Sequence, residues 1–439
     1  MSKDPARYLR GRSMLRATQC ATQCATRAAI IGLCSVALAL LSACTSAGPK
    51  SARHMPPVRH VFLIVLENQD YKDTFGNAAL DPYLMNTLRP MGAHLTQYYA
   101  TGHQSLDNYI ALLSGQPSSK QTQADCERFS DFQATGTSSD GLAIGDGCVY
   151  PASVKTLADQ LDAAALSWKG YMEDMGNNPA REQATCGHPA LNDPDRTQNP
   201  QPPSAAVPAG DQYAARHNPF VYFHSIIDTP RCAQRVVNLE KLPADLATLA
   251  TTPNFAFITP NLCHDGHDGD GSGLPGRGCV NGEPGGLRSA DEFLRTWVPR
   301  ILDSPAYQQD GLLIITFDES NVASIETTRD PATGKKMTLA TYAGAACCNQ
   351  QPGPNVTVPS IIDYVDEHEI YRVVLAGVGG DRIGAVLLSR FIEPNTVSDV
   401  PYNHYALLRS VEDLFGLGHL GYAAQKGLAP FGPEIFKRH

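Results

Sequence analysis

Short, mainly apolar runs alternate along this chain with segments of helical periodicity. The runs, which are typical of buried strands, occupy residues 61–66, 167–172, 254–259, 311–317 and 372–377. Apolar residues recur at helical spacing in residues 155–166, 289–302 and 403–418. Strands that lack polar alternation and are separated by helices favour a mainly parallel sheet covered on both faces. The pattern therefore predicts one α/β domain over residues 58–439.

Capping signals indicate where the three helices begin and end. Thr156 with Asp159, and Ser289 with Glu292, have the spacing of an N-terminal capping box. Gly418 suits the C-terminal end of the last helix, because glycine adopts the left-handed conformation that ends many helices. We therefore expect helices that start close to Thr156 and Ser289, and one that stops at Gly418.

The first 44 residues have the features of an export signal. Basic residues from Lys3 to Arg27 precede the apolar stretch 29–41, which is too short for a comfortable transmembrane span. The sequence LSAC then resembles a bacterial lipobox, in which Cys44 becomes the lipidated first residue. An ordinary secretory signal with a chance cysteine is the alternative. We expect a flexible tether at 45–57, and a cell-envelope lipoprotein held to the membrane by its lipid anchor or a secreted protein.

Cysteine content agrees with export. Eight cysteines follow the leader, at positions 126, 148, 186, 232, 263, 279, 347 and 348. An even number in an exported chain favours disulfides, and sequence neighbours suggest the pairs 126–148, 186–232 and 263–279. Cys347 and Cys348 would form a vicinal bridge or pair with other partners. No C-x-x-C spacing is present, so a structural zinc site is not expected.

Overall charge narrows the range of partners. The formal net charge is −9, whereas a nucleic-acid binder normally has a high pI or a basic patch. We therefore expect no nucleic-acid partner. A hydrophobic content of 42% is sufficient for a chain of 439 residues to bury a large core.

Polar side chains follow the apolar runs directly. Glu67 and Asn68 end the first run, Asp318 and Glu319 end the fourth, and the third leads into the His- and Asp-containing stretch 261–268. Because the carboxyl ends of parallel strands meet at one edge of a sheet, these groups are expected to lie close together. They would suit one divalent cation: oxygen ligands favour Mg, Ca or Mn, and a nearby histidine permits Zn or Fe. Solvated loop starts are the alternative.

A hydroxyl group at a helix start is a candidate nucleophile. Thr156 is the first choice and Ser153 a weaker one, because a helix N-terminus favours a bound phosphate and a metal lowers the pKa of a hydroxyl. The alternative is that Thr156 only caps its helix. His103, His217 and His404 each precede an apolar helix or strand, and could donate to phosphoryl oxygens or to a leaving group. Their alternative role is structural.

Seven segments together resemble one protein family. They are VFLIVLENQDYKDTFGN, GHQSLDNYIALLSG, VKTLADQLDAAALSWKGYMEDM, HNPFVYF, PNLCHDGHD, LLIITFDESN and YNHYALLRSVEDLFGL, in this order over nearly all of the chain after the leader. The set is similar to the bacterial phosphoesterase family of secreted acid phosphatases and non-specific phospholipases C, and most similar to its short acid phosphatase branch. The resemblance implies an alkaline-phosphatase-like three-layer α/β sandwich with a mainly parallel central sheet.

The same resemblance implies roles for individual residues. Glu67, Asn68, Asp318 and Glu319 would bind the metal, and Thr156 would be the nucleophile. The positions expected to contact substrate or the leaving group are His103, His217, His267 and His404, and those expected to bind substrate are Asn108, Asn218 and Asp268. The implied activity is metal-dependent hydrolysis of phosphate monoesters through a phospho-threonine, on a phosphorylated small molecule or a phospholipid headgroup.

Two other functions remain open, and two segments depart from the family pattern. A phospholipase C-type phosphodiesterase and a surface lipoprotein without catalysis are the alternatives. Relatives often have N-D-M-H-D where this chain has residues 264–268, so His264 could add a ligand or do nothing. The segment after residue 372 is also unusual. A C-x-P-x-R sulfatase signature and the D-S-A nucleophile motif of classical alkaline phosphatases are absent.

Overall fold

An eight-stranded sheet forms the centre of the computed structural model, which describes residues 55–437. Its strands are β1 (His60–Leu66), β2 (Ala93–Leu95), β6 (Trp168–Met172), β7 (Val236–Asn238), β8 (Phe255–Thr259), β9 (Gly311–Phe317), β14 (Ala385–Ser389) and β15 (Thr396–Ser398), in the order β15-β2-β14-β9-β1-β8-β6-β7. β14 is antiparallel to both neighbours, and the other pairs are parallel. All seven residues of β1 are buried, as an apolar run covered on both faces requires.

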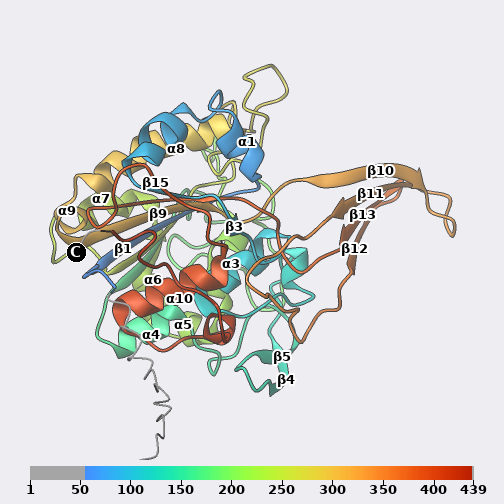
Figure 1. Ribbon diagram of the computed structural model, residues 1–439. Helices are drawn as coiled ribbons and strands as arrows, with labels where there is room; N and C mark the ends of the chain where they lie inside the picture. The colour runs from blue at the N-terminus through green and yellow to red at the C-terminus, as the bar shows by residue number, and fades with distance from the viewer. Residues whose placement is uncertain (1–54, 438–439) are drawn as a thin grey trace, which may run out of the picture. The chain divides into compact units, whose positions relative to one another are not determined.

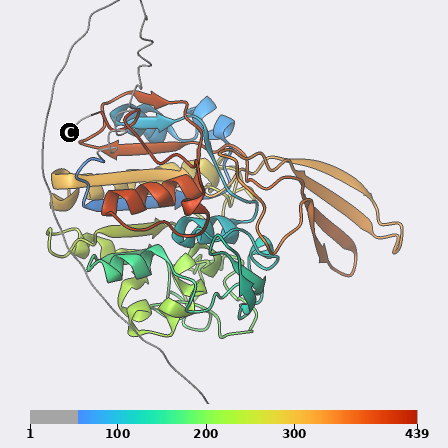
Figure 2. The ribbon, with the colours of Figure 1, turned by 60° about the horizontal axis from the view of Figure 1, so that its bottom comes forward.

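Helices cover both faces of this sheet and make three layers. They are α1 (Tyr71–Gly76), α2 (Arg89–Met91), α3 (Ser105–Ser114), α4 (Leu157–Ala163), α5 (His224–Ile227), α6 (Pro230–Arg235), α7 (Leu242–Asp245), α8 (Gly286–Leu302), α9 (Pro305–Asp310) and α10 (His404–Phe415). In Figure 1, α1, α8 and α9 lie above the sheet, and α3, α4 and α10 lie below it. Figure 2 shows α10 lying across the strands from the lower side. The expected three-layer α/β architecture is confirmed.

The fold also contains short helical turns of other types. They are the π-helix η1 (Leu84–Leu88) and the 3-10 helices η2 (Thr122–Ala124), η3 (Ala215–His217), η4 (Pro219–Tyr222), η5 (Leu239–Lys241) and η6 (Gly421–Ala424). Two small sheets also form, β3 (Tyr98–Tyr99) with β16 (Tyr402–Asn403), and β4 (Gln133–Thr137) with β5 (Ala143–Asp146). The first pair is parallel, so it places the segments that lead into α3 and α10 side by side.

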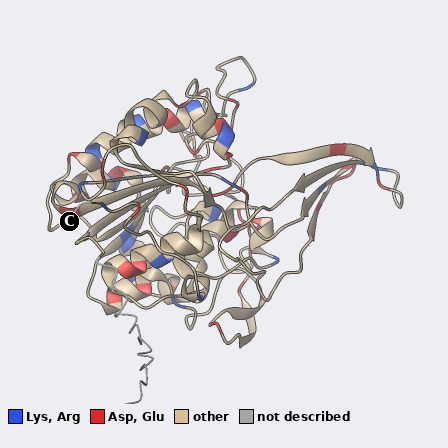
Figure 3. Cartoon of the chain, in the orientation of Figure 1, with Lys and Arg blue, Asp and Glu red and all other residues tan. Residues whose placement is uncertain are grey.

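Two expected helix ends were wrong by a few residues. Helix α8 begins at Gly286 instead of near Ser289, because the Ser289 hydroxyl accepts a hydrogen bond from the backbone of Gly285 from inside the helix. Helix α10 stops at Gly416, which has the left-handed φ of 68°, two residues before Gly418. Figure 3 marks charged residues along α8, and Phe293 and other apolar residues of this helix are buried.

A second, four-stranded sheet, here called the outer sheet, is formed by strands that follow β9 in the chain. Its strands are β10 (Ala323–Arg329), β11 (Lys336–Tyr342), β12 (Ser360–Val365) and β13 (Glu369–Leu375), in the order β10-β11-β13-β12. The run at 372–377 was expected in the central sheet, but it belongs to β13, where Ile370, Val373 and Leu375 are buried and intervening residues are more exposed. In the central sheet, β14 is the strand that lies next to β9.

The three disulfides that sequence spacing suggested are present, and Cys347 and Cys348 form the vicinal bridge, one of the two alternatives left open for them. Three connect Cys126–Cys148, Cys186–Cys232 and Cys263–Cys279, and the fourth is the vicinal bridge Cys347–Cys348. Within residues 55–437, no helix has both the length and the apolar character needed to span a membrane. The leader and Cys44 lie outside the described residues.

Asp81 is expected to make the stability of the fold depend on pH. Both oxygens of this buried carboxyl lack a hydrogen-bond partner, and burial together with Asp291 raises its pKa from 3.8 to about 7. The unfolded chain therefore loses this proton more readily, so wild-type stability should fall as the pH rises from about 4 to about 7. Above pH 7, Asp81→Asn should be more stable than the wild type by about 1–2 kcal/mol, measured by urea unfolding. Equal stability at pH 8 would contradict this.

Candidate active site

The carboxylate of Glu67 is the centre of a buried polar cluster at the end of β1. Its Oε2 accepts hydrogen bonds from Ser105 Oγ at 2.7 Å and from Asn68 Nδ2 at 3.0 Å. Its Oε1 accepts one from Tyr109 Oη at 2.8 Å and lies 3.2 Å from His217 Nε2. Ser105 is the first residue of α3, so the sheet edge and a helix start meet at this carboxylate.

Asp318 ends β9 beside Glu67, as the strand pattern predicts. Its Oδ1 accepts hydrogen bonds from the backbone N–H groups of Asn68, at 2.9 Å, and Glu319, at 2.6 Å. Its Oδ2 is buried without a hydrogen-bond partner. Asn68 has a left-handed φ of 51°, which turns the chain sharply after β1 and directs its N–H to Asp318. The four residues expected to bind metal therefore do come together.

Asp265 and His217 complete the cluster from two other segments. Asp265 Oδ1 accepts a hydrogen bond from the His267 backbone at 2.9 Å, while its Oδ2 is buried, has no hydrogen-bond partner, and lies 3.8 Å from His217 Nδ1. Glu67, His217 and Asp265 each offer one ligand atom, and these atoms all lie within 4.8 Å of one another. Buried acceptor atoms that converge without donors are what a cation site requires.

The electrostatics of the cluster also fit a cation. Burial, followed by the charges of Glu67 and Glu319, raises the pKa of Asp318 well above its ordinary value. Burial also raises the pKa of Asp265 well above its ordinary value and that of Glu319 to about 7. Burial would do the same to Glu67, but His217, the charge of Arg216 and the Ser105 hydrogen bond together outweigh it and lower the pKa of Glu67 to about 2. A divalent cation would balance this concentration of buried carboxylates.

His103 lies at the edge of the cluster and is held between two carboxylates. Its Nε2 lies 3.0 Å from Asp381 Oδ2 and its Nδ1 lies 3.5 Å from Glu319 Oε2. Glu319 also accepts a hydrogen bond from the backbone of Gln104, at the N-cap of α3. Burial alone would lower the pKa of His103, but the two carboxylates raise it to about 9. His103 is therefore a cation that fixes Glu319 beside the start of α3.

His404, the residue expected to act as acid for the leaving group, is buried and contacts the backbone of Asp318. Its Nε2 lies 2.7 Å from the carbonyl oxygen of Asp318, and its Nδ1 lies 3.0 Å from Tyr98 Oη. Both ring nitrogens are thus engaged, and burial lowers the pKa to about 4. Both partners of this imidazole are protein groups, and its contact with the Asp318 carbonyl can hold Asp318 in place.

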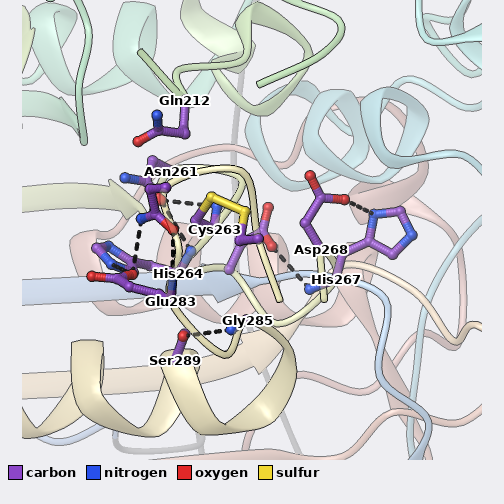
Figure 4. Close-up of a disulfide and its surroundings, with 12 residues drawn as sticks. Gln212, Asn261, Cys263, His264, His267, Asp268, Glu283, Gly285 and Ser289 are labelled. Carbon is purple, nitrogen blue, oxygen red and sulfur yellow. Dashed lines mark hydrogen bonds and ion pairs between the residues drawn. A yellow bond between two sulfur atoms is a disulfide. The ribbon is translucent and has the colours of Figure 1, made fainter. Parts of the chain in front are cut away.

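The glycine-rich loop after β8 presents two histidines on opposite sides (Figure 4). His264 lies 2.9 Å from Glu173 and 2.6 Å from Glu283, so it does not add a ligand to the cluster. The His267 side chain is about half exposed (49%), and its Nδ1 lies 3.6 Å from Asp268 Oδ1. The His267 backbone is bound to Asp265. His267 therefore combines proximity to the cluster with access to solvent.

Three other expected site residues have local partners. The Thr156 hydroxyl donates to Asp159 Oδ2 at 2.9 Å and accepts from the Asp159 backbone at 3.2 Å, which is a complete capping box. Among residues 55–437 it makes no hydrogen bond to the Glu67 cluster. Asn108 binds backbone groups of Thr101 and Gly102, so it shapes the turn before α3 rather than facing substrate. Asn218 donates to Tyr213 Oη at 2.9 Å, and its Oδ1 is buried without a partner.

The sequence predictions missed Ser105, Tyr109 and Arg216. Ser105 follows His103 closely and begins an apolar helix, so the reasoning that selected Thr156 applies equally to it. The longer α3, of ten residues, also presents a stronger helix N-terminus than the seven-residue α4. Arg216 is buried next to His217, with its Nε 3.8 Å from Asp125, and no motif in the sequence distinguishes it.

Strand-end carboxylates, a histidine and a helix-start hydroxyl thus lie together in one buried cluster that could hold a cation. The chain belongs to the Phosphoesterase family, whose model matches residues 82–418. It is similar to a probable acid phosphatase of Kluyveromyces lactis, with 22% identity over 83% of this chain and 59% of that protein. It is also similar to the phosphatidylinositol-3-phosphatase of Mycobacterium tuberculosis, with 24% identity over 67% of this chain and 75% of that protein.

Further comparisons place limits on these similarities. An acid phosphatase of Aspergillus fumigatus is 24% identical over 82% of this chain and 55% of that protein, so the chain spans little more than half the length of these two fungal relatives. A solved protein of the alkaline phosphatase superfamily from Vibrio parahaemolyticus is similar with a TM-score of 0.41 and 14% identity, covering 83% of this chain and 68% of that one.

Proposed function

We propose that this protein is a metal-dependent hydrolase of phosphate monoesters. Membership of the Phosphoesterase family and the names of the acid phosphatase relatives support the reaction class. The observation that carries the proposal is the Ser105 hydroxyl, 2.7 Å from Glu67 at the start of α3, beside buried carboxylate oxygens that have no partner. The substrate would be a phosphorylated small molecule or a phospholipid headgroup, and membrane attachment through Cys44 remains a prediction.

The residues that would hold the metal differ from the predicted set. Glu67, His217 and Asp265 would supply ligand atoms, together with the free Oδ2 of Asp318. The expected ligands Asn68 and Glu319 instead donate backbone hydrogen bonds that fix Asp318. When bound, a divalent cation would stabilise negative charge on the phosphoryl oxygens and on the attacking oxygen. The mixed oxygen and nitrogen donors permit Mn, Fe or Zn as well as Mg or Ca.

Ser105 replaces Thr156 as the proposed nucleophile. Its O–H donates to Glu67 Oε2, which orients the oxygen and provides an acceptor for the proton as Oγ bonds to phosphorus. The N-terminal end of α3 would stabilise charge on the phosphoryl oxygens, and Arg216 adds a positive charge nearby. The bond from phosphorus to the ester oxygen then breaks, leaving a phosphoserine that water hydrolyses.

His267 is the proposed acid for the leaving oxygen. It is about half exposed, and its backbone bond to Asp265 holds it next to the cluster. Asp268 Oδ1 lies 3.6 Å from its Nδ1 and would orient the imidazole. By contrast, His103 and His404 are buried and fully engaged with protein groups. We propose that His103 holds Glu319 in place and that His404 holds Asp318.

A substrate panel tests the reaction class. The purified protein, supplied with each candidate metal, should hydrolyse p-nitrophenyl phosphate at least about tenfold faster, by kcat/KM, than bis-p-nitrophenyl phosphate or p-nitrophenyl phosphorylcholine. Faster hydrolysis of p-nitrophenyl phosphorylcholine than of p-nitrophenyl phosphate would instead support the phospholipase C alternative. If no phosphate ester were hydrolysed with any metal, the protein would match the non-catalytic surface lipoprotein.

A further inference from the structure

The vicinal disulfide Cys347–Cys348 lies between β11 and β12, at the base of the outer sheet. Both of its cysteines are half-buried, whereas the six other disulfide cysteines in residues 55–437 are buried. It joins adjacent residues, while the others join residues 16 to 46 positions apart. Because a disulfide stabilises a fold mainly by closing a loop in the unfolded chain, this bond contributes the least of the four to overall stability.

One end of the surrounding loop is attached to His103. The backbone N–H of Ala345 donates to Asp381 Oδ1 at 2.6 Å, and the Asp381 N–H donates back to the Ala345 carbonyl at 3.1 Å. Asp381 Oδ2 in turn holds His103 at 3.0 Å. Gln350, two residues after the disulfide, donates to the carbonyl of Thr101 at 2.6 Å. The loop therefore contacts the His103 segment at two points.

The two sulfur atoms are in contact with the segment that leads to His404. Cys347 Sγ lies 3.2 Å from the Tyr402 carbonyl oxygen, and Cys348 Sγ lies 3.4 Å from that of Pro401. A disulfide sulfur has no proton to donate, but a thiol at either position would have an acceptor at hand. His404, two residues further on, binds the Asp318 carbonyl at 2.7 Å. A change at the disulfide is thus transmitted to both histidines that position the cluster carboxylates.

The backbone of the loop also depends on the ring that the disulfide closes. Cys348 and Asn349 have φ values of 64° and 57°, in the left-handed region that residues with a Cβ rarely adopt. This conformation is unfavourable for a residue such as cysteine, and it persists only where covalent or tertiary contacts enforce it. Opening the ring removes the covalent constraint on Cys348, so the loop can relax and release Ala345 from Asp381.

We propose that Cys347–Cys348 is a redox-sensitive site that controls the activity of the catalytic cluster. An external dithiol supplies two electrons and two protons, the Sγ–Sγ bond becomes two thiols, and the dithiol becomes a cyclic disulfide. The reduced loop holds Asp381 and the 401–402 segment less firmly, so His103 and His404 position Glu319 and Asp318 less well. This inference rests on the proposed function only for its effect on turnover.

Selective reduction is the first measurement. The folded protein is treated with graded dithiothreitol, free thiols are alkylated with iodoacetamide, and peptides are quantified by mass spectrometry. We expect alkylation at Cys347 and Cys348 at a dithiothreitol concentration that leaves the six buried cysteines protected. Amide hydrogen exchange of the peptides containing Ala345 and Asp381 should then accelerate at least tenfold. This readout does not require catalytic activity.

Turnover is the second measurement. At the same dithiothreitol concentration, kcat for p-nitrophenyl phosphate should fall about fivefold, and re-oxidation should restore it. The double variant Cys347→Ser/Cys348→Ser should have the lowered kcat from the start and should not respond to dithiothreitol, which controls for reduction elsewhere. Its thermal midpoint should stay close to that of the wild type.

Two results would overturn the redox proposal. The first is that Cys347–Cys348 resists reduction until the buried disulfides also open. The second is that two thiols form at Cys347 and Cys348 while hydrogen exchange and kcat stay at the oxidised values. A protein that lacks phosphatase activity even when oxidised would refute the proposed function, and the exchange measurement would still decide whether the loop is coupled to Asp381.

Discussion

Replacing Ser105 with alanine is expected to lower kcat for p-nitrophenyl phosphate by about a thousandfold or more. Among the described residues, Ser105 is the only one that begins a helix and whose hydroxyl also donates a hydrogen bond to Glu67. The variant removes this hydroxyl. Alanine is accommodated readily at this position, so the thermal midpoint and metal content should change little. Steady-state kinetics, calorimetry and elemental analysis on the same preparation measure the three quantities.

Thr156→Ala is the matched control, because it removes a hydroxyl from another helix start. Loss of its capping bonds to Asp159 should cost about 1 kcal/mol of stability, and kcat should stay within about twofold of the wild type. The opposite result, in which Thr156→Ala is inactive and Ser105→Ala is active, would return the nucleophile to Thr156. If both variants kept full activity, a covalent intermediate on either hydroxyl would be excluded.

The strand ends were the most predictable part of the site. An apolar run buried on both faces can be recognised without tertiary information, and the residue after it must lie at the carboxyl edge of a parallel sheet. Glu67 and Asp318 therefore come together in the structure as expected, since β1 and β9 are adjacent and in register from His60 to Leu66. The main helices that cover the faces were also predictable, because their apolar residues recur at helical spacing.

The remaining groups of the cluster depend on long-range packing. His217 is delivered by a 3-10 turn and Asp265 by an irregular loop, and neither kind of segment has a periodicity that indicates its direction. The capping box at Thr156 is a genuine local signal, but it indicates a helix start without saying which helix start faces the cluster. The strand β13 was misplaced because an apolar run reveals burial but not which sheet provides the neighbours.

Glu67→Gln is expected to lose the bound metal and the activity together while the fold persists. The substitution keeps the size of the side chain and one of the two acceptor oxygens that Ser105 and Tyr109 use, and it removes the charge that a cation would balance. Metal content should fall at least about tenfold, and kcat about a thousandfold, as removal of a direct ligand generally causes. Elemental analysis after gel filtration and assays over a range of added metal measure both.

Thermal stability distinguishes a lost metal from a damaged fold. A ligand that binds only the folded state stabilises it, so treatment with EDTA should lower the wild-type thermal midpoint by several degrees. The same treatment should leave Glu67→Gln unchanged, because the variant has no metal to lose. Asp270→Asn is the matched control: this exposed carboxylate lies on the same loop as Asp265 but outside the cluster, so it should respond to EDTA as the wild type does. An EDTA response that survives in Glu67→Gln would place the metal elsewhere and remove Glu67 from its coordination.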